Sequence, residues 1–266
     1  MQTNLENCHP LSDHLKTEGK CPDLEGKELY QVVPWLEVPI NHSQSSKPYE
    51  IESRLNEFEQ ISNPRIFKMH VLWDEIPRPL APQSKVIVIT RDVRDVPYSM
   101  YQHHQTLTEK SELFKNGEPP TFEEYFDSWL LSGPYYFKHL SSVWPHRNDP
   151  CAYFLTYEKL KADTWGETKK LLKFLQWNIC DDDVRRAIDL ASFANMRKAE
   201  KFILFQGNAF EKEKHFIREG QVGKNRLRLT EDMVRRLAEK GREFGLDDDA
   251  MELAFGQGGL EAELAL

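Results

Sequence analysis

The segment SKVIVITRDVRDVPYSM, residues 84–100, decides the fold of this chain. Its first half is a near-continuous apolar run from Val86 to Thr90, typical of a parallel strand that is buried on both faces. A polar turn follows, and Pro97 then stands in the first turn of a helical pattern over residues 96–106. The segment predicts a strand followed directly by a helix, which is the repeating unit of an α/β domain.

The same alternation extends to both sides of this segment. The expected strands cover residues 64–71, 84–90 and 151–157. The expected helices cover residues 53–62, 96–106, 122–144 with a break at Gly133-Pro134, 165–177, 182–190, and a closing amphipathic helix with Met233, Leu237 and Phe244 on one side. The order of elements predicts an α/β fold, a three-layer sandwich with a central parallel sheet.

Length and composition indicate one domain. The chain has 266 residues, of which 39% are hydrophobic, and it contains no clear linker, so we expect a single domain over residues 1–266. Within it, residues 1–27 are expected to form a loose N-terminal arm and residues 255–266 a C-terminal tail. The net charge of -8 argues against nucleic acid as a partner and requires that any anion site be built locally.

Cysteine usage and hydropathy bear on the compartment. The four cysteines form no CxxC pair, which argues against a zinc site and a disulfide framework, and we expect no bound metal. The first thirty residues contain no apolar run of signal-peptide length, and no stretch approaches a membrane span. These features predict a cytoplasmic protein without a membrane partner.

Polar side chains gather where the predicted strands end. Lys68 and His70 lie two residues apart near the end of the first strand, so they share one face. Arg91 follows the second strand, and Tyr157 ends the third. Ligands of open parallel sheets bind outside the carboxyl ends of the strands, so a base, a cation and a phenol are expected at one rim.

Two segments have the chemistry of an anion site. After Arg91, Asp95 is placed to cap the next helix and Ser99 lies one turn in, so free N–H groups, a guanidinium and a hydroxyl would meet. Residues 215–230 combine two glycines with Arg218 and other basic residues in an acidic chain. The alternative for both segments is a solvated basic surface, with Arg91 paired to a nearby carboxylate.

Five stretches, taken in order, resemble the cytosolic sulfotransferases. FKMHV (67–71) resembles KTHLP of that family, TRDVRDVPYSMYQHH (90–104) resembles RNPKDVAVSYYHF, and REGQVGKNRLRLT (218–230) resembles RKGxxGDWKNxFT. LTYEKLKADT (155–164) and SFANMRK (192–198) are similar to two supporting stretches. The resemblance covers about residues 30–230, and joint occurrence in order is far more specific than any single motif.

The resemblance implies a P-loop-like sulfotransferase fold and a function: sulfonate transfer from 3′-phosphoadenosine 5′-phosphosulfate (PAPS) to a hydroxyl or amine of a small-molecule acceptor. His70 would be the general base, and Lys68 would steady charge on the transferring group. The residues that would bind the co-substrate are Arg91, Ser99, Arg218 and Gly220 at the 3′-phosphate, and Tyr157 and Phe193 at the adenine. His104, Tyr136 and Phe137 lie where the family walls the acceptor pocket, and the resemblance leaves a homodimer open.

The chain also departs from the family pattern. Glu219 stands where the family has a lysine, which is expected to weaken nucleotide binding unless the carboxylate points away. No segment resembles TYPKSGTTW, the loop that binds the 5′-phosphosulfate, so we expect an N-terminally truncated sequence or a diverged relative. The alternative function is therefore a non-catalytic or weakly active protein that binds 3′-phosphoadenosine nucleotides without turnover. A P-loop kinase is disfavoured because no GxxxxGK[ST] motif occurs.

Overall fold

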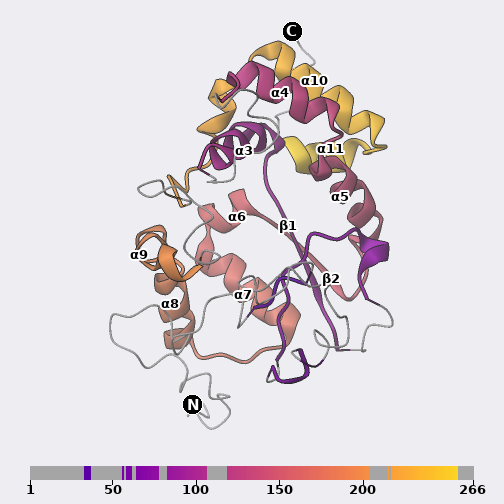
Figure 1. The fold of residues 1–266 in the computed structure, drawn as a ribbon. Helices are drawn as coiled ribbons and strands as arrows, with labels where there is room; N and C mark the ends of the chain where they lie inside the picture. Colours follow the sequence, from indigo (N-terminus) through magenta and orange to yellow (C-terminus); the bar gives the residue numbers. More distant parts are fainter. Residues whose placement is uncertain are drawn as a thin grey trace.

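The computed structural model describes residues 33–36, 56, 58–61, 64–77, 83–106, 119–203, 215 and 217–256. The expected N-terminal arm, half of the expected helix 53–62 and residues 257–266 of the expected tail lie outside these ranges. Within them, β1 (Val86–Thr90) and β2 (Ala152–Thr156) form a parallel pair. Val86 is paired with Ala152 and Thr90 with Thr156, so both strands end at the same edge (Figure 1).

The helices occupy the positions that the sequence predicts, with additions. The α-helices are α3 (Val96–His104), α4 (Phe122–Leu131), α5 (Tyr135–Val143), α6 (Tyr157–Ala162), α7 (Thr164–Leu175), α8 (Asp181–Leu190), α9 (Phe193–Ile203), α10 (Glu231–Glu243) and α11 (Asp248–Phe255). The short 3-10 helices are η2 (Trp73–Glu75), η3 (Val93–Asp95), η5 (Trp144–His146) and η6 (Asn225–Arg228). The expected break at Gly133-Pro134 separates α4 from α5.

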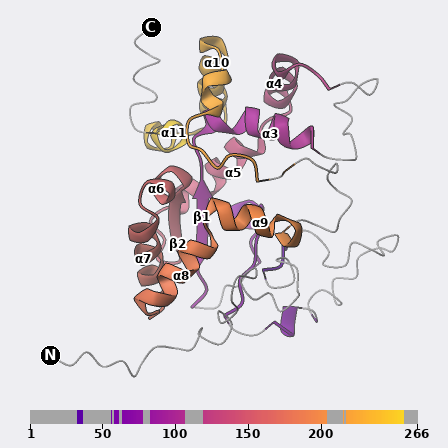
Figure 2. The same ribbon diagram turned by 90° about the vertical axis from the view of Figure 1, so that its left-hand side faces the viewer.

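Helices cover both faces of the strand pair. Successive side chains of a strand point to opposite faces, and Tyr153 and Phe154 of β2 do so here. The Tyr153 ring lies 5.1 Å from that of Phe174 in α7, whereas the Phe154 ring lies 5.8 Å from that of Trp144, just after α5. Figure 2 shows α6 and α7 on one side of the sheet. The three layers predicted from the order of elements are thus present.

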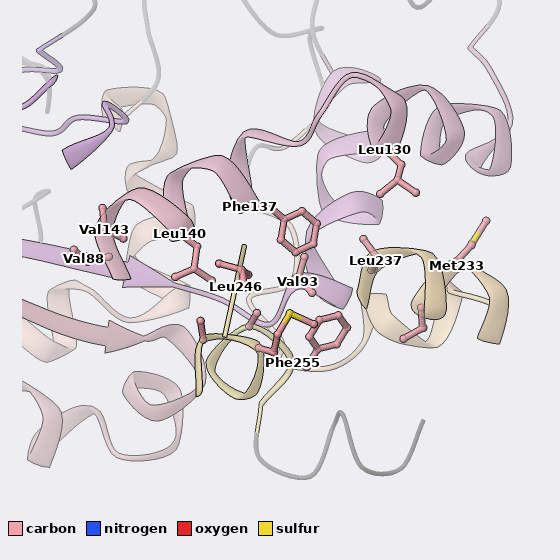
Figure 3. Close-up of a cluster of buried hydrophobic side chains, with 14 of the residues drawn as sticks. Val88, Val93, Leu130, Phe137, Leu140, Val143, Met233, Leu237, Leu246 and Phe255 are labelled. Atoms are coloured by element: carbon pink, nitrogen blue, oxygen red, sulfur yellow. The ribbon is translucent and has the colours of Figure 1, made fainter. Parts of the chain in front are cut away.

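The core extends from Val88 of β1 to the region beyond the carboxyl end of that strand, where α4, α5, α10 and α11 meet (Figure 3). Phe126, Phe137, Leu237 and Phe255 are fully buried there. Each such side chain contributes about 1.5–3 kcal/mol through removal of apolar surface from water. This core anchors the turn after β1, because Val93 is also fully buried within it.

Three local expectations need correction. The expected strand 64–71 is, in the described residues, a single parallel bridge between Trp35 and Lys68, with Lys68 donating to the Pro34 carbonyl at 2.8 Å. Pro34 has no N–H to extend that ladder. The stretch SFANM (192–196), for which the sequence predicts a turn, instead begins α9 at Phe193, and α6 and α11 were not predicted. Phe255, expected to begin a tail, is the buried last residue of α11.

None of the helices in the described ranges is long and apolar enough to cross a membrane.

Candidate functional site

A buried carboxylate, Asp95, organises the site at the carboxyl end of β1. It occupies the N-cap position of α3, but its side chain makes no capping bond, contrary to the sequence-based expectation. Instead Asp95 Oδ2 accepts from the Gly223 N–H at 2.8 Å, and Oδ1 accepts from the Arg226 N–H at 3.0 Å. The Asn225 amide donates to the Asp95 carbonyl at 3.2 Å. Because Asp95 is 0% exposed, these bonds hold the loop that contains residues 218–226 against the carboxyl end of β1.

Arg91 extends from the end of β1 across this loop. Its Nη2 donates to Asp95 Oδ2 at 3.2 Å and to the Gln221 carbonyl at 3.1 Å. The guanidinium carbon lies 4.7 Å from the centroid of the Tyr157 ring, a cation–π contact. Arg91 Nε is buried and has no hydrogen-bond partner among the described residues. One donor of a cation is therefore left for a ligand.

Arg218 approaches the same place from the loop. Its Nη2 donates to the Ser99 carbonyl at 3.1 Å and to Ser99 Oγ at 3.3 Å. Arg218 Nη1 is buried and, within the described part of the chain, has no partner. Burial lowers the pKa of Arg218, although a guanidinium stays charged near neutral pH. A second unused donor thus lies in the site.

A glycine and two rings complete the arrangement. Tyr157 donates its hydroxyl proton to the Gly220 carbonyl at 3.1 Å, and burial raises the pKa of Tyr157, so this proton is retained. Gly220 has a φ of +61°, and a Cβ there would lie 2.6 Å from Cδ2 of Phe193. Only glycine therefore fits between the loop and the Phe193 ring.

The six residues expected at the nucleotide are linked by these contacts. We call them the anion cradle: Arg91, Ser99, Tyr157, Phe193, Arg218 and Gly220. A buried N–H without a partner is costly, and a phosphate monoester supplies several charged acceptor oxygens. The chemistry of the cradle therefore suits an anion beside an aromatic surface.

Lys68 and His70 lie on a separate segment. Lys68 Nζ is 4.0 Å from the centroid of the Trp35 ring, and the exposed His70 packs edge-on against the same ring at 4.8 Å. Two consecutive tyrosines of α5 join this segment to the cradle. Tyr135 donates to the His70 carbonyl, and Tyr136 donates to the Arg91 carbonyl at 2.8 Å. The His70 segment and the end of β1 are thus held by adjacent residues.

Of the residues expected at the acceptor wall, Phe137 is placed elsewhere. It is fully buried in the core, so it has no surface to offer an acceptor. Tyr136 binds the Arg91 carbonyl, as above. His104 Nδ1 lies 3.0 Å from the Tyr125 hydroxyl, and burial lowers the pKa of His104. His104 is therefore a neutral, hydrogen-bonded imidazole between α3 and α4 near neutral pH.

The sequence missed three contacts that shape the site. They are the loop contacts of Asp95, the bond from Tyr136 to the Arg91 carbonyl, and an ion pair between Glu219 and Lys224 at 2.7 Å. The adjacent tyrosines and the opposite charges five residues apart were visible signals, but neither specifies a partner. The Glu219 carboxylate, expected to weaken anion binding, is engaged by Lys224.

Comparisons with known proteins all match this chain to sulfotransferases. A family model for the sulfotransferase domain matches residues 8–243. The chain is 25% identical to sulfotransferase 1 family member D1 of Rattus norvegicus over 255 residues, covering 88% of this chain and 80% of that protein. It is 27% identical to cytosolic sulfotransferase 9 of Arabidopsis thaliana over 254 residues, covering 86% of this chain and 68% of that protein.

Solved structures with the same fold include two PAP complexes. Mouse sulfotransferase SULT7A1 complexed with PAP is similar with a TM-score of 0.63 and 21% identity, covering 80% of this chain and 75% of that one. Retinol dehydratase, in complex with androsterone and inactive cofactor PAP, is similar with a TM-score of 0.58 and 23% identity, covering 74% and 57%. The predicted α/β sulfotransferase fold is confirmed.

Proposed function

Because the chain belongs to the sulfotransferase family, we propose that it moves a sulfonate group from PAPS to a hydroxyl or amine of a small molecule. The observation that carries this proposal is the pair of buried donors, Arg91 Nε and Arg218 Nη1, which have no partner among the described residues. They lie in a site held together by a buried carboxylate, so their geometry is set before a ligand arrives.

In this proposal the anion cradle holds the 3′-phosphoadenosine part of the co-substrate. Arg91, Arg218 and the Ser99 hydroxyl bind the 3′-phosphate, and the Gly220 backbone approaches it closely. The rings of Tyr157 and Phe193 contact the adenine. Two of the solved relatives contain PAP, which is consistent with this class of ligand.

The proposed base is His70. The acceptor oxygen or nitrogen forms a bond to sulfur, and its proton passes to the His70 imidazole. The bond from sulfur to the 5′-phosphate oxygen breaks, and PAP leaves with that electron pair. Lys68 steadies the charge on the group in transfer. The exposure of His70 supports this role, because a base must reach the acceptor.

A second histidine, His139 of α5, lies near the proposed base. Burial lowers the pKa of His139, and repulsion from His70 lowers it further. His139 is therefore neutral near neutral pH and adds no charge beside the base.

The test combines turnover with binding. Purified protein is incubated with PAPS and a panel containing a phenol, an aliphatic alcohol and a primary amine, and sulfonated product is measured by mass spectrometry. We expect product from the unaltered chain, and His70→Ala is expected to lower kcat by about 100-fold or more. His146→Ala is the matched control, because that imidazole pairs with Asp149 away from the cradle.

The binding arm uses calorimetry with PAP. Arg218→Met is expected to weaken PAP by about 10- to 100-fold, which corresponds to the loss of charged hydrogen bonds. It should hardly change the affinity for AMP, which lacks the 3′-phosphate. Arg185→Met, which removes an exposed partner of Asp182 on α8, is the control.

The results separate the two candidate functions. PAP binding with no product from any acceptor would favour the alternative, a protein that binds 3′-phosphoadenosine nucleotides without turnover. That alternative is kept because the sequence has no segment resembling TYPKSGTTW. Failure to bind PAP would overturn both.

A further inference from the structure

An ion pair spans the loop that carries Gly220. Lys224 Nζ lies 2.7 Å from Glu219 Oε2, and the two side chains are 50% and 49% exposed. The backbone between them is fixed, since the Gly220 carbonyl accepts from Tyr157 and the Gly223 N–H donates to Asp95. The two charged side chains therefore extend from a rigid loop into solvent and can change partners without refolding it.

The Glu219 carboxylate acts on the cation next to it. Burial lowers the pKa of Arg218, the charge of Glu219 raises it, and the nearby Arg91 lowers it. Glu219 thus partly neutralises the charge of Arg218, whose buried Nη1 has no hydrogen-bond partner among the described residues. A carboxylate in this position competes with any anion for the same positive charge.

Lys224 is placed to take either partner. Its neighbours in sequence, Gly223 and Asn225, both bond to Asp95, so its Cα is held beside the cradle. A lysine ammonium is a compact charge on a flexible four-carbon stem, and an exposed ion pair holds it weakly. An anion bound by Arg91 and Arg218 would offer Lys224 a stronger, less exposed partner.

We propose that Glu219 and Lys224 form an affinity-limiting latch, in which Lys224 leaves Glu219 to bind the 3′-phosphate. The inference rests on the proposed function, because it assumes that the cradle binds that phosphate. Beyond that function, it assigns Lys224 as a further phosphate-binding residue and Glu219 as an internal competitor that lowers affinity for 3′-phosphorylated nucleotides.

The experiment is a double-mutant cycle read by calorimetry with PAP and AMP at low ionic strength. Glu219→Ala is expected to tighten PAP by about 5- to 10-fold, since it removes the competitor. Lys224→Ala is expected to weaken PAP by a similar factor. The double variant should return to about the affinity of the unaltered chain. AMP affinity should change by less than about twofold throughout.

A matched pair controls for general surface charge. Lys169 and Asp181 lie 2.8 Å apart and are 42% and 53% exposed, on α7 and α8. Lys169→Ala and Asp181→Ala should leave PAP affinity within about twofold. Thermal unfolding of every variant checks that the loop is intact.

Three outcomes overturn the latch. Glu219→Ala within twofold of the unaltered chain shows that no competition exists. A double variant that keeps the full gain of Glu219→Ala shows that Lys224 only shields Glu219 and does not bind phosphate. Failure of the unaltered chain to bind PAP overturns the proposed function as well, whereas the first two results overturn the latch alone.

Discussion

The anion cradle and the His70 segment are attached to the same fold in different ways. The cradle surrounds Asp95, whose buried carboxylate accepts bonds from Gly223, Arg226 and Arg91. The exposed His70 is held by a ring contact with Trp35 and by a hydroxyl bond to its carbonyl. The cradle is therefore a set of mostly half-buried residues held around a buried carboxylate, whereas His70 lies on the surface.

This difference bears on the proposed roles. Phosphate binding needs several donors aimed at one point, and a buried network fixes their directions at the cost of unpaired donors when no anion is bound. A base that serves an acceptor needs access more than burial. We expect changes in the cradle to affect stability and nucleotide binding together, and changes at His70 to affect turnover alone.

Asp95→Ala should have the largest effect. It leaves Arg91 without its carboxylate and the N–H groups of Gly223 and Arg226 without acceptors, so the free energy of unfolding should fall by about 3 kcal/mol. Urea denaturation measures this change. Asp127→Ala is the control, because Asp127 is 55% exposed and its 2.7 Å pair with Arg236 should be worth about 0.5 kcal/mol.

An equal loss in the two aspartate variants would remove the distinction between the cradle and an ordinary surface. A further variant, Asp95→Asn, keeps one acceptor oxygen and removes the charge. It should recover part of the stability lost in Asp95→Ala, because an amide oxygen can still accept a backbone N–H.

Gly220→Ala should have an intermediate effect with two separable causes. Its φ of +61° disfavours any side chain, and the new Cβ would lie 2.6 Å from the Phe193 ring. Gly245→Ala isolates the first cause, since Gly245 has a φ of +77° and a Cβ added there would meet no atom within 4 Å. We expect about 1 kcal/mol for Gly245→Ala and about 2 kcal/mol for Gly220→Ala in urea denaturation.

One experiment tests whether the Phe193 ring causes the difference between these two glycines. In a Phe193→Ala background, Gly220→Ala should cost no more than Gly245→Ala does, because the ring is gone. If the excess persists there, the Phe193 contact is not its cause, and the packing of that ring on the loop plays no part in shaping the cradle.

Local signals explain which elements could be predicted from the sequence. The apolar run before Thr90 and the placement of Pro97 give β1 and α3 without reference to the rest of the chain. The prediction of a strand at 64–71 was wrong because a strand forms only where a neighbouring strand can pair with it. The described partner is a short segment that contains Pro34. Helix α11 was missed although Asp247 caps it and Met251, Ala254 and Phe255 follow a helical spacing, because a helix of 8 residues is too short for its pattern to stand out.

The site shows the same division. The sequence placed Asp95 correctly at the start of α3. Its side chain, however, accepts a hydrogen bond from Gly223, 128 residues away, and no local rule identifies that partner. The strand ends and the two anion-site segments indicated four of the cradle residues, the resemblance added Phe193 and Gly220, and the structure adds how all six are held together. Contacts of one side chain with a distant backbone are decided by packing, which a single sequence does not display.

The smallest effect should appear in the titration of two histidines, one beside the cradle and one beside the His70 segment. Burial, the nearby His104 and the charge of Arg218 lower the pKa of His103, while burial and His70 lower that of His139. PAP bound at Arg218 would offset the guanidinium charge, so the midpoint of His103 should move to higher pH while that of His139 stays in place. Nuclear magnetic resonance of the imidazole protons follows both midpoints with and without PAP.

The lowered pKa values of His103 and His139 also affect stability. The free energy of unfolding should fall as pH drops below about 6.5, because the unfolded chain then binds protons that the folded chain does not. That loss should be smaller when PAP is bound, and equal movement of the two midpoints would show that the cradle and the His70 segment respond to the ligand as one unit.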